Sequence, residues 1–97
     1  MLDLINYKEK KFLLNSNMVL RNVGNKYWVL DTRLGNQYRL NNISYNILNL
    51  FREKKSITDV LELIADEYNV NIEKLFCDSS TMLNFAIEKN VIEEMVE

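Results

Sequence analysis

The segment that decides the fold is residues 27–51, YWVLDTRLGNQYRLNNISYNILNLF, in which two strand-like runs precede a helical pattern. Residues 26–32 place apolar side chains on both faces of a strand, whereas residues 37–40 alternate polar with apolar side chains. This contrast predicts that the first run lies centrally in a sheet and the second at an edge. Gly35 lies in the turn between them, where glycine can adopt a positive φ.

The strand before this segment completes a small sheet. Residues 18–23 are rich in β-branched and apolar side chains, and Gly24-Asn25 is a two-residue turn typical of a tight hairpin. We therefore predict three antiparallel strands.

Three helices follow the strands. At residues 42–53 the apolar period changes from two to 3.6, and Asn41 or Asn42 can cap the first turn. Ser56-Ile57-Thr58-Asp59 has the spacing of a capping box and opens a second helix that ends near Tyr68. Asn71 can cap a third helix, and Asn90 suits the left-handed residue that ends it. The predicted fold is α+β, with a three-stranded antiparallel sheet followed by a three-helix bundle in a winged-helix-like order.

The chain of 97 residues is long enough for one domain with a modest core. We assign residues 18–97 to this domain and residues 1–17 to an N-terminal arm, which pairs either with the sheet or with a second copy in a homodimer. Residues 91 and 92 are expected to fold back on the core. We find no apolar segment long enough for a signal peptide or a membrane span, which favours a cytoplasmic protein and argues against a membrane partner.

Nucleic acid is a poor candidate partner, because the net charge is −2 and the pI is about 5.2. A winged-helix transcription factor is the alternative function. Its recognition helix would be the third helix, but there Lys74, Asn84 and Lys89 are offset by acidic neighbours, namely Glu73, Asp78 and Glu88.

Catalysis is not expected. The sequence contains no His, so Cys77 has no imidazole to activate it, and no cluster of carboxylates suggests a metal site. Gly24 and Gly35 are isolated in turns and do not form a phosphate-binding loop. We therefore expect no cofactor and no metal.

The edge strand is a candidate peptide-binding element, since its unpaired backbone groups can pair with an extended guest. About three to five such hydrogen bonds, each worth about 0.5–1.5 kcal/mol, barely offset an association cost of at least about 4 kcal/mol. Apolar contacts are therefore required. Phe85 lies outside the buried stripe of the third helix, on a face with Lys74, Asp78 and Thr81. Alternatively, the N-terminal arm covers Phe85, or Phe85 is a lone exposed aromatic residue. We expect Trp28 and Tyr38 to be core residues.

The sequence resembles the pyrroloquinoline quinone biosynthesis protein D (PqqD) family, also called the RiPP recognition element. The resemblance covers approximately residues 18–93 and departs at Asn90, where the family typically has Gly, and at Leu48, where it often has Trp. It rests on these matching residues: Val29-Leu30-Asp31-Thr32, Gly35, Tyr38-x-Leu40-Asn41, Ile47-x-x-Leu50-Phe51, Ser56-Ile57-Thr58-Asp59-Val60, Tyr68-x-Val70, Asp78 and Met82-Leu83.

This resemblance implies a non-catalytic domain that binds the leader segment of a ribosomally made precursor peptide. In that family the leader lies as an added strand against the third strand, beneath the third helix, and is presented to a modifying enzyme that is often a radical S-adenosylmethionine enzyme. The implied cleft residues in this chain are Asn36, Gln37, Tyr38, Arg39, Leu40, Lys74, Asp78, Thr81, Met82 and Phe85.

Overall fold

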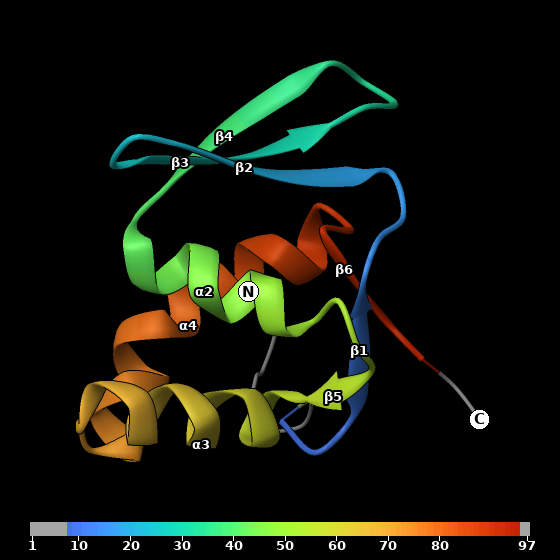
Figure 1. Cartoon of the computed structure of the whole chain (residues 1–97). Coiled ribbons are helices and arrows are strands. Elements are labelled where there is room, and N and C mark those ends of the chain that lie inside the picture. Colours follow the sequence, from blue (N-terminus) through green and yellow to red (C-terminus); the bar gives the residue numbers. More distant parts are fainter. Residues whose placement is uncertain (1–7, 96–97) are drawn as a thin grey trace.

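The computed structural model describes residues 8–95 and has an α+β fold, as the sequence predicts. A three-stranded antiparallel sheet lies on one side of a group of helices, and a second, smaller sheet lies beside their ends (Figure 1). The described elements, in chain order, are β1 (Lys11–Leu14), β2 (Met18–Val23), β3 (Lys26–Asp31), β4 (Asn36–Leu40), α2 (Asn42–Leu50), β5 (Lys55–Ser56), α3 (Ile57–Tyr68), α4 (Ile72–Glu88) and β6 (Ile92–Glu94).

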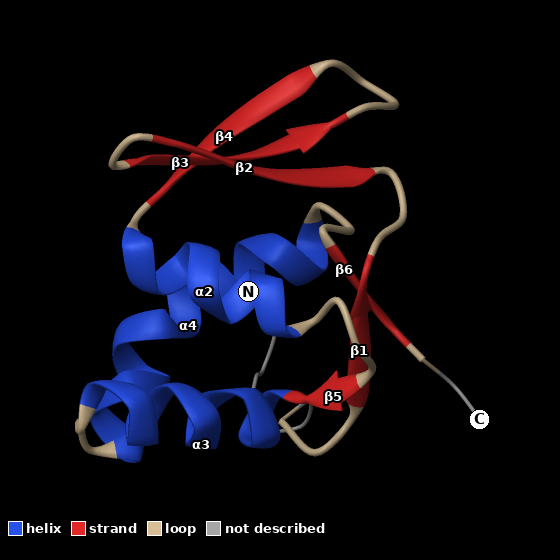
Figure 2. Ribbon diagram, in the orientation of Figure 1, coloured by secondary structure: helices blue, strands red, loops and turns tan. Residues whose placement is uncertain are grey.

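The larger sheet has the strand order β2-β3-β4, which confirms β3 as the central strand and β4 as an edge. Its inner face packs on the helices, as Figure 2 shows. In one cross-strand row on that face, Val29 of β3 lies opposite both Leu20 and Tyr38, and Val29 is fully buried. Tyr38 is half-buried and packs against the core.

Trp28 lies on the other face of this sheet, since neighbouring residues of a strand point to opposite faces. It is half-buried and does not belong to the hydrophobic core. The prediction that Trp28 is a core residue was therefore wrong. The physical reason is that the described helices all lie on the Val29 side of the sheet, with α2 and α4 next to it, and leave the Trp28 face open (Figure 1).

The smaller sheet has the order β5-β1-β6 and was not predicted. Phe12 of β1 is 1% exposed, and its ring contacts that of Phe51 edge-on at 6.4 Å between centroids. The described part of the arm thus pairs with β5 and β6 rather than with the larger sheet, which corrects that alternative. Because β1 has partners on both sides, it offers no free strand edge to a second copy. Residues 1–7 of the arm lie outside the described residues.

The helix starts were predicted correctly from their polar caps. Asn41 accepts a hydrogen bond from the Ser44 backbone N–H at 2.7 Å, and Ser56 accepts one from Asp59 at 3.0 Å. Asn71 caps α4 in the same way. Helix α2 ends at Leu50, three residues before the expected end at residue 53. The chain leaves the helix there because the Phe51 carbonyl accepts a hydrogen bond from Leu14 of β1 at 2.7 Å, before β5 joins the small sheet.

The C-terminal end of α4 also follows the prediction. Asn90 has a left-handed backbone with φ of 59°, and Val91 then donates a hydrogen bond to the Ala86 carbonyl at 2.8 Å. Val91 and Ile92 return to the core and are buried. Within residues 8–95, none of the helices has the length and apolar character needed to cross a bilayer.

Candidate functional site

The candidate site is built on the open edge of β4. Strand β4 pairs with β3 in the register Asp31↔Asn36 to Tyr27↔Leu40, and no other described strand lies on its far side. In an antiparallel pair, every second residue of an edge strand directs its backbone N–H and C=O away from the sheet. Those groups of β4 can pair with an additional strand.

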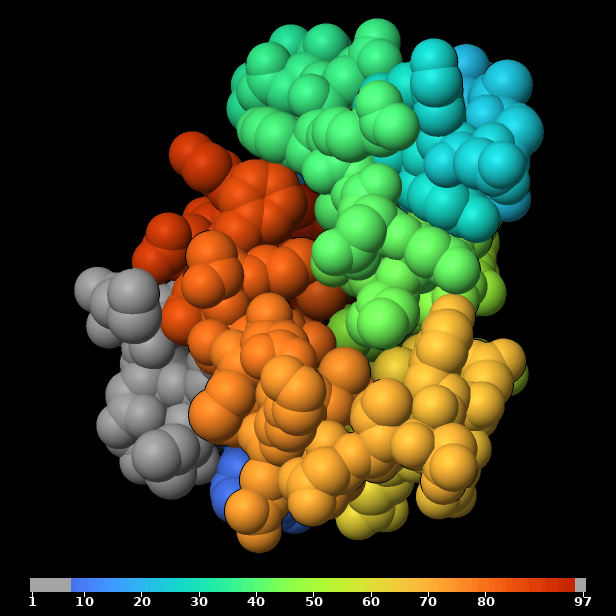
Figure 3. Space-filling model, turned by 90° about the vertical axis from the view of Figure 1, so that its left-hand side faces the viewer, coloured from blue at the N-terminus to red at the C-terminus, as the bar shows by residue number. Residues whose placement is uncertain are grey.

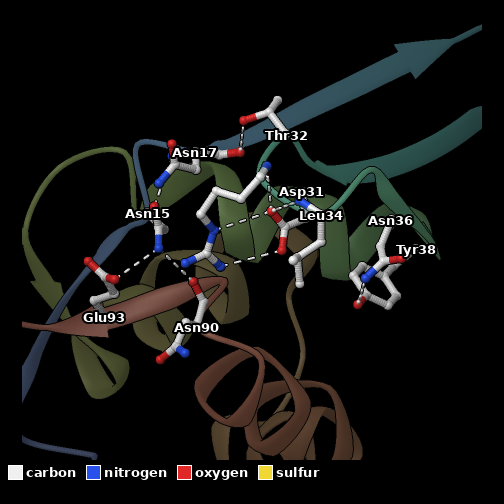
Figure 4. A network of polar contacts seen from close by, with 10 residues as sticks. Asn15, Asn17, Asp31, Thr32, Leu34, Asn36, Tyr38, Asn90 and Glu93 are labelled. Atoms are coloured by element: carbon white, nitrogen blue, oxygen red, sulfur yellow. Dashed lines mark hydrogen bonds and ion pairs between the residues drawn. The ribbon is translucent and has the colours of Figure 1, made fainter.

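A carboxylate at the end of β3 stabilises the turn that leads into β4. Asp31 is 3% exposed and accepts hydrogen bonds from the backbone N–H groups of Arg33 at 2.9 Å and Leu34 at 3.3 Å. It also accepts from the Arg33 guanidinium, with the Nε at 3.3 Å (Figure 4). The Arg33 side-chain hydrogen bond and these backbone N–H groups lower the pKa of Asp31 below its ordinary value of 3.8, against the opposing effect of burial. The ionised carboxylate thereby stabilises the β3–β4 turn.

A buried amide connects this turn region to the rest of the molecule. Asn15 is 5% exposed, and its Nδ2 donates to the Asn90 carbonyl at 3.1 Å and to the Glu93 carboxylate at 2.8 Å. Its Oδ1 accepts from the Asn17 N–H at 2.9 Å, and the Asn17 carbonyl accepts from Thr32 (Figure 4). Sequence reasoning missed this network, because its members lie up to 78 residues apart in the chain.

A groove of about 620 Å³ runs between β4 and α4. Figure 3 looks onto this side, where the green residues of β4 and α2 lie above and beside the orange residues of α4. The rings of Tyr38 from β4 and Phe85 from α4 meet edge-on, with centroids 4.9 Å apart and planes at 74°. The groove is lined by Gln37, Tyr38, Arg39, Leu40, Asn41, Ser44, Asp78, Thr81, Met82 and Phe85.

All but two of the predicted cleft residues therefore line one groove. The exceptions are Asn36, whose side-chain amide donates to the Tyr38 hydroxyl at 3.3 Å, and Lys74, which pairs with Asp78 at 3.1 Å. Sequence reasoning missed Asn41 and Ser44 as lining residues. Their signal was present in the helix cap, since the Asn41 side chain accepts from Ser44 at the point where β4 turns into α2.

The groove continues along α4 into a second pocket of about 160 Å³. The two share Asn41, Ser44 and Asp78, and the second pocket is the one that contains Lys74. Its apolar wall comes from Ile43, Val70 and Leu75. The site thus combines a strand edge of five residues with two adjoining, partly apolar pockets beside it.

The charged and thiol side chains near the groove lie on different sides of α4. The Lys74–Asp78 ion pair is exposed and contributes little to stability. Cys77 is exposed and lines a different pocket with Lys8 and Phe76, on the other flank of α4. In residues 8–95, no group of three or more His, Cys, Asp or Glu side chains is placed to hold a metal ion.

The fold and the groove define a small sheet-and-helix domain in which the open edge of β4 lies beside the long helix α4. Residues 19–92 match the family model described as coenzyme PQQ synthesis protein D (PqqD), and the chain belongs to this family. The fold is similar to that of TbiB1, solved in complex with the TbiA(beta) leader peptide, with a TM-score of 0.70 and 19% sequence identity. That match covers 88% of this chain and 99% of the TbiB1 chain. No curated protein matches the sequence significantly.

Proposed function

We propose that this chain binds the leader segment of a ribosomally synthesised precursor peptide as an added strand along β4, and presents it to a modifying enzyme. The observation that carries the proposal is the meeting of the open β4 edge with the Tyr38–Phe85 ring pair in one groove. Membership in the PqqD family and the fold shared with a protein solved with a leader peptide support it. In this proposal the domain itself performs no catalysis, and the partner is an enzyme of the radical S-adenosylmethionine type.

Micromolar affinity requires both the backbone edge of β4 and the apolar side chains of the groove. Strand β4 has five residues, so a guest strand gains about three to five backbone hydrogen bonds worth about 0.5–1.5 kcal/mol each. Association costs at least about 4 kcal/mol, and a micromolar complex needs about −8 kcal/mol. Burying one apolar guest side chain against Tyr38 and Phe85 adds about 1.5–3 kcal/mol. Because the strand hydrogen bonds roughly offset the association cost, about three to five such anchors are needed for a micromolar complex.

The proposed site combines backbone pairing along β4 with apolar contacts from β4 and α4. The backbone of β4 pairs with the guest, while Tyr38, Met82 and Phe85 form the apolar floor of the groove. The side chains of Gln37 and Arg39 lie on the opposite face of the sheet from Tyr38. The residues proposed to bind the peptide are Asn36, Gln37, Tyr38, Arg39, Leu40, Lys74, Asp78, Thr81, Met82 and Phe85.

The DNA-binding alternative receives no support from α4. Asn84, a candidate for base contacts, is buried, and Lys74 is paired with Asp78. The remaining exposed cation considered for this role, Lys89, follows Glu88 at the end of the helix. A helix that reads DNA needs exposed donors and a basic surface.

Fluorescence anisotropy with a labelled leader peptide, taken from a precursor gene beside the gene for this chain, tests the proposal. We expect micromolar or tighter binding and slower amide hydrogen exchange in Asn36–Leu40 when the peptide is bound. Duplex DNA at two salt concentrations serves as the comparison. Salt-dependent DNA binding without peptide binding, or peptide binding that leaves β4 exchange unchanged, would refute the proposal.

A further inference from the structure

The outer face of the β2-β3-β4 sheet is unusual in composition. Antiparallel sheets that expose one face to water normally carry polar residues there. Of the eight outward positions on this sheet, four are apolar, three are cationic and none is acidic, although the chain has more acidic than basic residues. These residues, which we call the Trp28 face, are Val19, Arg21, Val23, Lys26, Trp28, Leu30, Gln37 and Arg39.

Two of the three cations form one row with the aromatic residue across the three strands. Arg21 pairs in register with Trp28, and Trp28 pairs in register with Arg39. The Arg39 guanidinium lies over the Trp28 ring, 5.4 Å from its centroid, so it is already positioned against the indole. The surface therefore presents an aromatic ring between two guanidinium-bearing residues.

Apolar side chains extend this row on both sides. Val19 lies in register with Leu30 and is 42% exposed, while Val23 is 59% exposed. All helices lie on the opposite side of the sheet, so no described element covers this face (Figure 1). Exposed apolar side chains interspersed with arginine and an aromatic ring are typical of a contact surface.

We propose that the Trp28 face docks a protein partner whose contact surface carries carboxylates around an apolar residue. Trp and Arg are the residues most enriched among those that dominate the energy of protein interfaces. A face with only cations selects an acidic partner, because like charges across an interface are costly. Identifying this partner as the enzyme that modifies the bound peptide rests on the proposed function. The preference of this face for an acidic partner does not depend on it.

The position of this face suits presentation of a peptide. A guest strand on β4 extends the sheet sideways and leaves the outer side of β2 and β3 uncovered. Outward side chains of the guest then continue the same surface next to Gln37 and Arg39. A partner docked over Trp28 would therefore contact both the domain and its peptide.

A single-stranded nucleic acid is a weaker candidate for this surface. Bases stack on aromatic rings, but Val19, Val23 and Leu30 offer no such surface. Three cations on a chain with a net charge of −2 also supply little counterion release. A second copy could approach through the acidic exposed side of α3, at Asp59, Glu62 and Asp66, and the experiment below includes this outcome.

Two variants test the proposal at positions that do not line the peptide groove, Arg21→Glu on β2 and Trp28→Ala on β3. The matched control is Arg52→Glu, an exposed arginine after α2 and outside the larger sheet. The probe is the purified modifying enzyme encoded beside the precursor gene, with its affinity measured by calorimetry at low and high salt. Leader-peptide affinity is measured in parallel, and circular dichroism checks that each variant is folded.

We expect Arg21→Glu and Trp28→Ala each to weaken enzyme binding at least tenfold, with the wild-type affinity falling as salt rises, while peptide affinity and the control remain unchanged. No enzyme binding by the wild type, or equal binding by the folded variants, overturns the proposal. Two other results overturn the proposal. One is self-association in sedimentation that the same variants abolish, and the other is binding of a 12-nucleotide RNA that the same variants abolish. If the enzyme binds as expected but no peptide binds β4, the proposed function fails and the Trp28 face stands.

Discussion

Replacing Phe85 with alanine tests the peptide groove most directly. The Phe85 ring is half-buried and meets Tyr38 edge-on at 4.9 Å, so it forms part of the groove and little of the central core. Truncation removes most of the apolar surface offered to one guest side chain, worth about 1.5–3 kcal/mol. At about 1.4 kcal/mol per factor of ten, the dissociation constant should rise roughly 10- to 150-fold.

The same substitution also costs stability, and this effect must be separated from binding. A fully buried Phe→Ala change costs about 3–5 kcal/mol, so a half-buried ring should cost about 1–2 kcal/mol. For a domain of this size that lowers Tm by roughly 5–15 °C. The domain should remain folded at 15 °C, where the binding assay is run.

Phe76→Ala is the matched control. Phe76 lies on the same helix and is also half-buried, but it lines the pocket with Leu61 and Cys77 on the other flank of α4. We expect a similar loss of Tm and an unchanged peptide affinity, as measured by thermal unfolding and fluorescence anisotropy. Equal loss of affinity in both variants would mean that stability, not contact, explains the effect. Unchanged affinity in Phe85→Ala would remove this residue from the site.

Two further predictions concern the strand that carries the groove. Gln37→Pro and Tyr38→Pro should have different effects, because neighbouring N–H groups of an edge strand point in opposite directions. We expect one variant to lower Tm by breaking a hydrogen bond to β3, and the other to weaken peptide binding with a smaller loss of stability. Two variants with the same profile in both assays would contradict this. Because the folded protein lowers the pKa of Asp31 below 3.8, its carboxylate should stabilise the fold above that pH and lose this effect as the pH falls through the folded-state pKa. The Tm difference between wild type and Asp31→Asn should thus be largest near neutral pH and shrink in acid, and a difference independent of pH would exclude this role.

The local elements were predictable because their signals are local. Each helix start carries a side-chain cap within three residues of the N–H that it binds, as at Asn41, Ser56 and Asn71. The glycine turns and the change of apolar period from two to 3.6 likewise depend on neighbours in the chain. The central and edge positions of β3 and β4 were also predicted, from apolar residues on both faces of β3, although no described helix covers its Trp28 face.

The candidate groove was partly predictable for the same reason. Phe85 departs from the helical period of α4, and that departure placed it on the side that faces β4. Asn41 and Ser44 were missed as lining residues because the cap that they form at the start of α2 already accounts for both. Their second role depends on where α4 passes, which no short-range pattern records.

The amino-acid sequence by itself determined the order of strands and helices, their caps and their turns, because these depend on interactions within a few residues. Only the tertiary structure decided that β1 pairs with β5 and β6, which leaves the edge of β4 open, and that Trp28 lies on an uncovered face. It also decided that Asn15 donates a hydrogen bond to Glu93, 78 residues further along the chain. A short apolar run specifies that a strand forms but not which strand it pairs with, because its hydrogen bonds can be made by any backbone. Its partner is chosen by how the whole chain buries its apolar side chains.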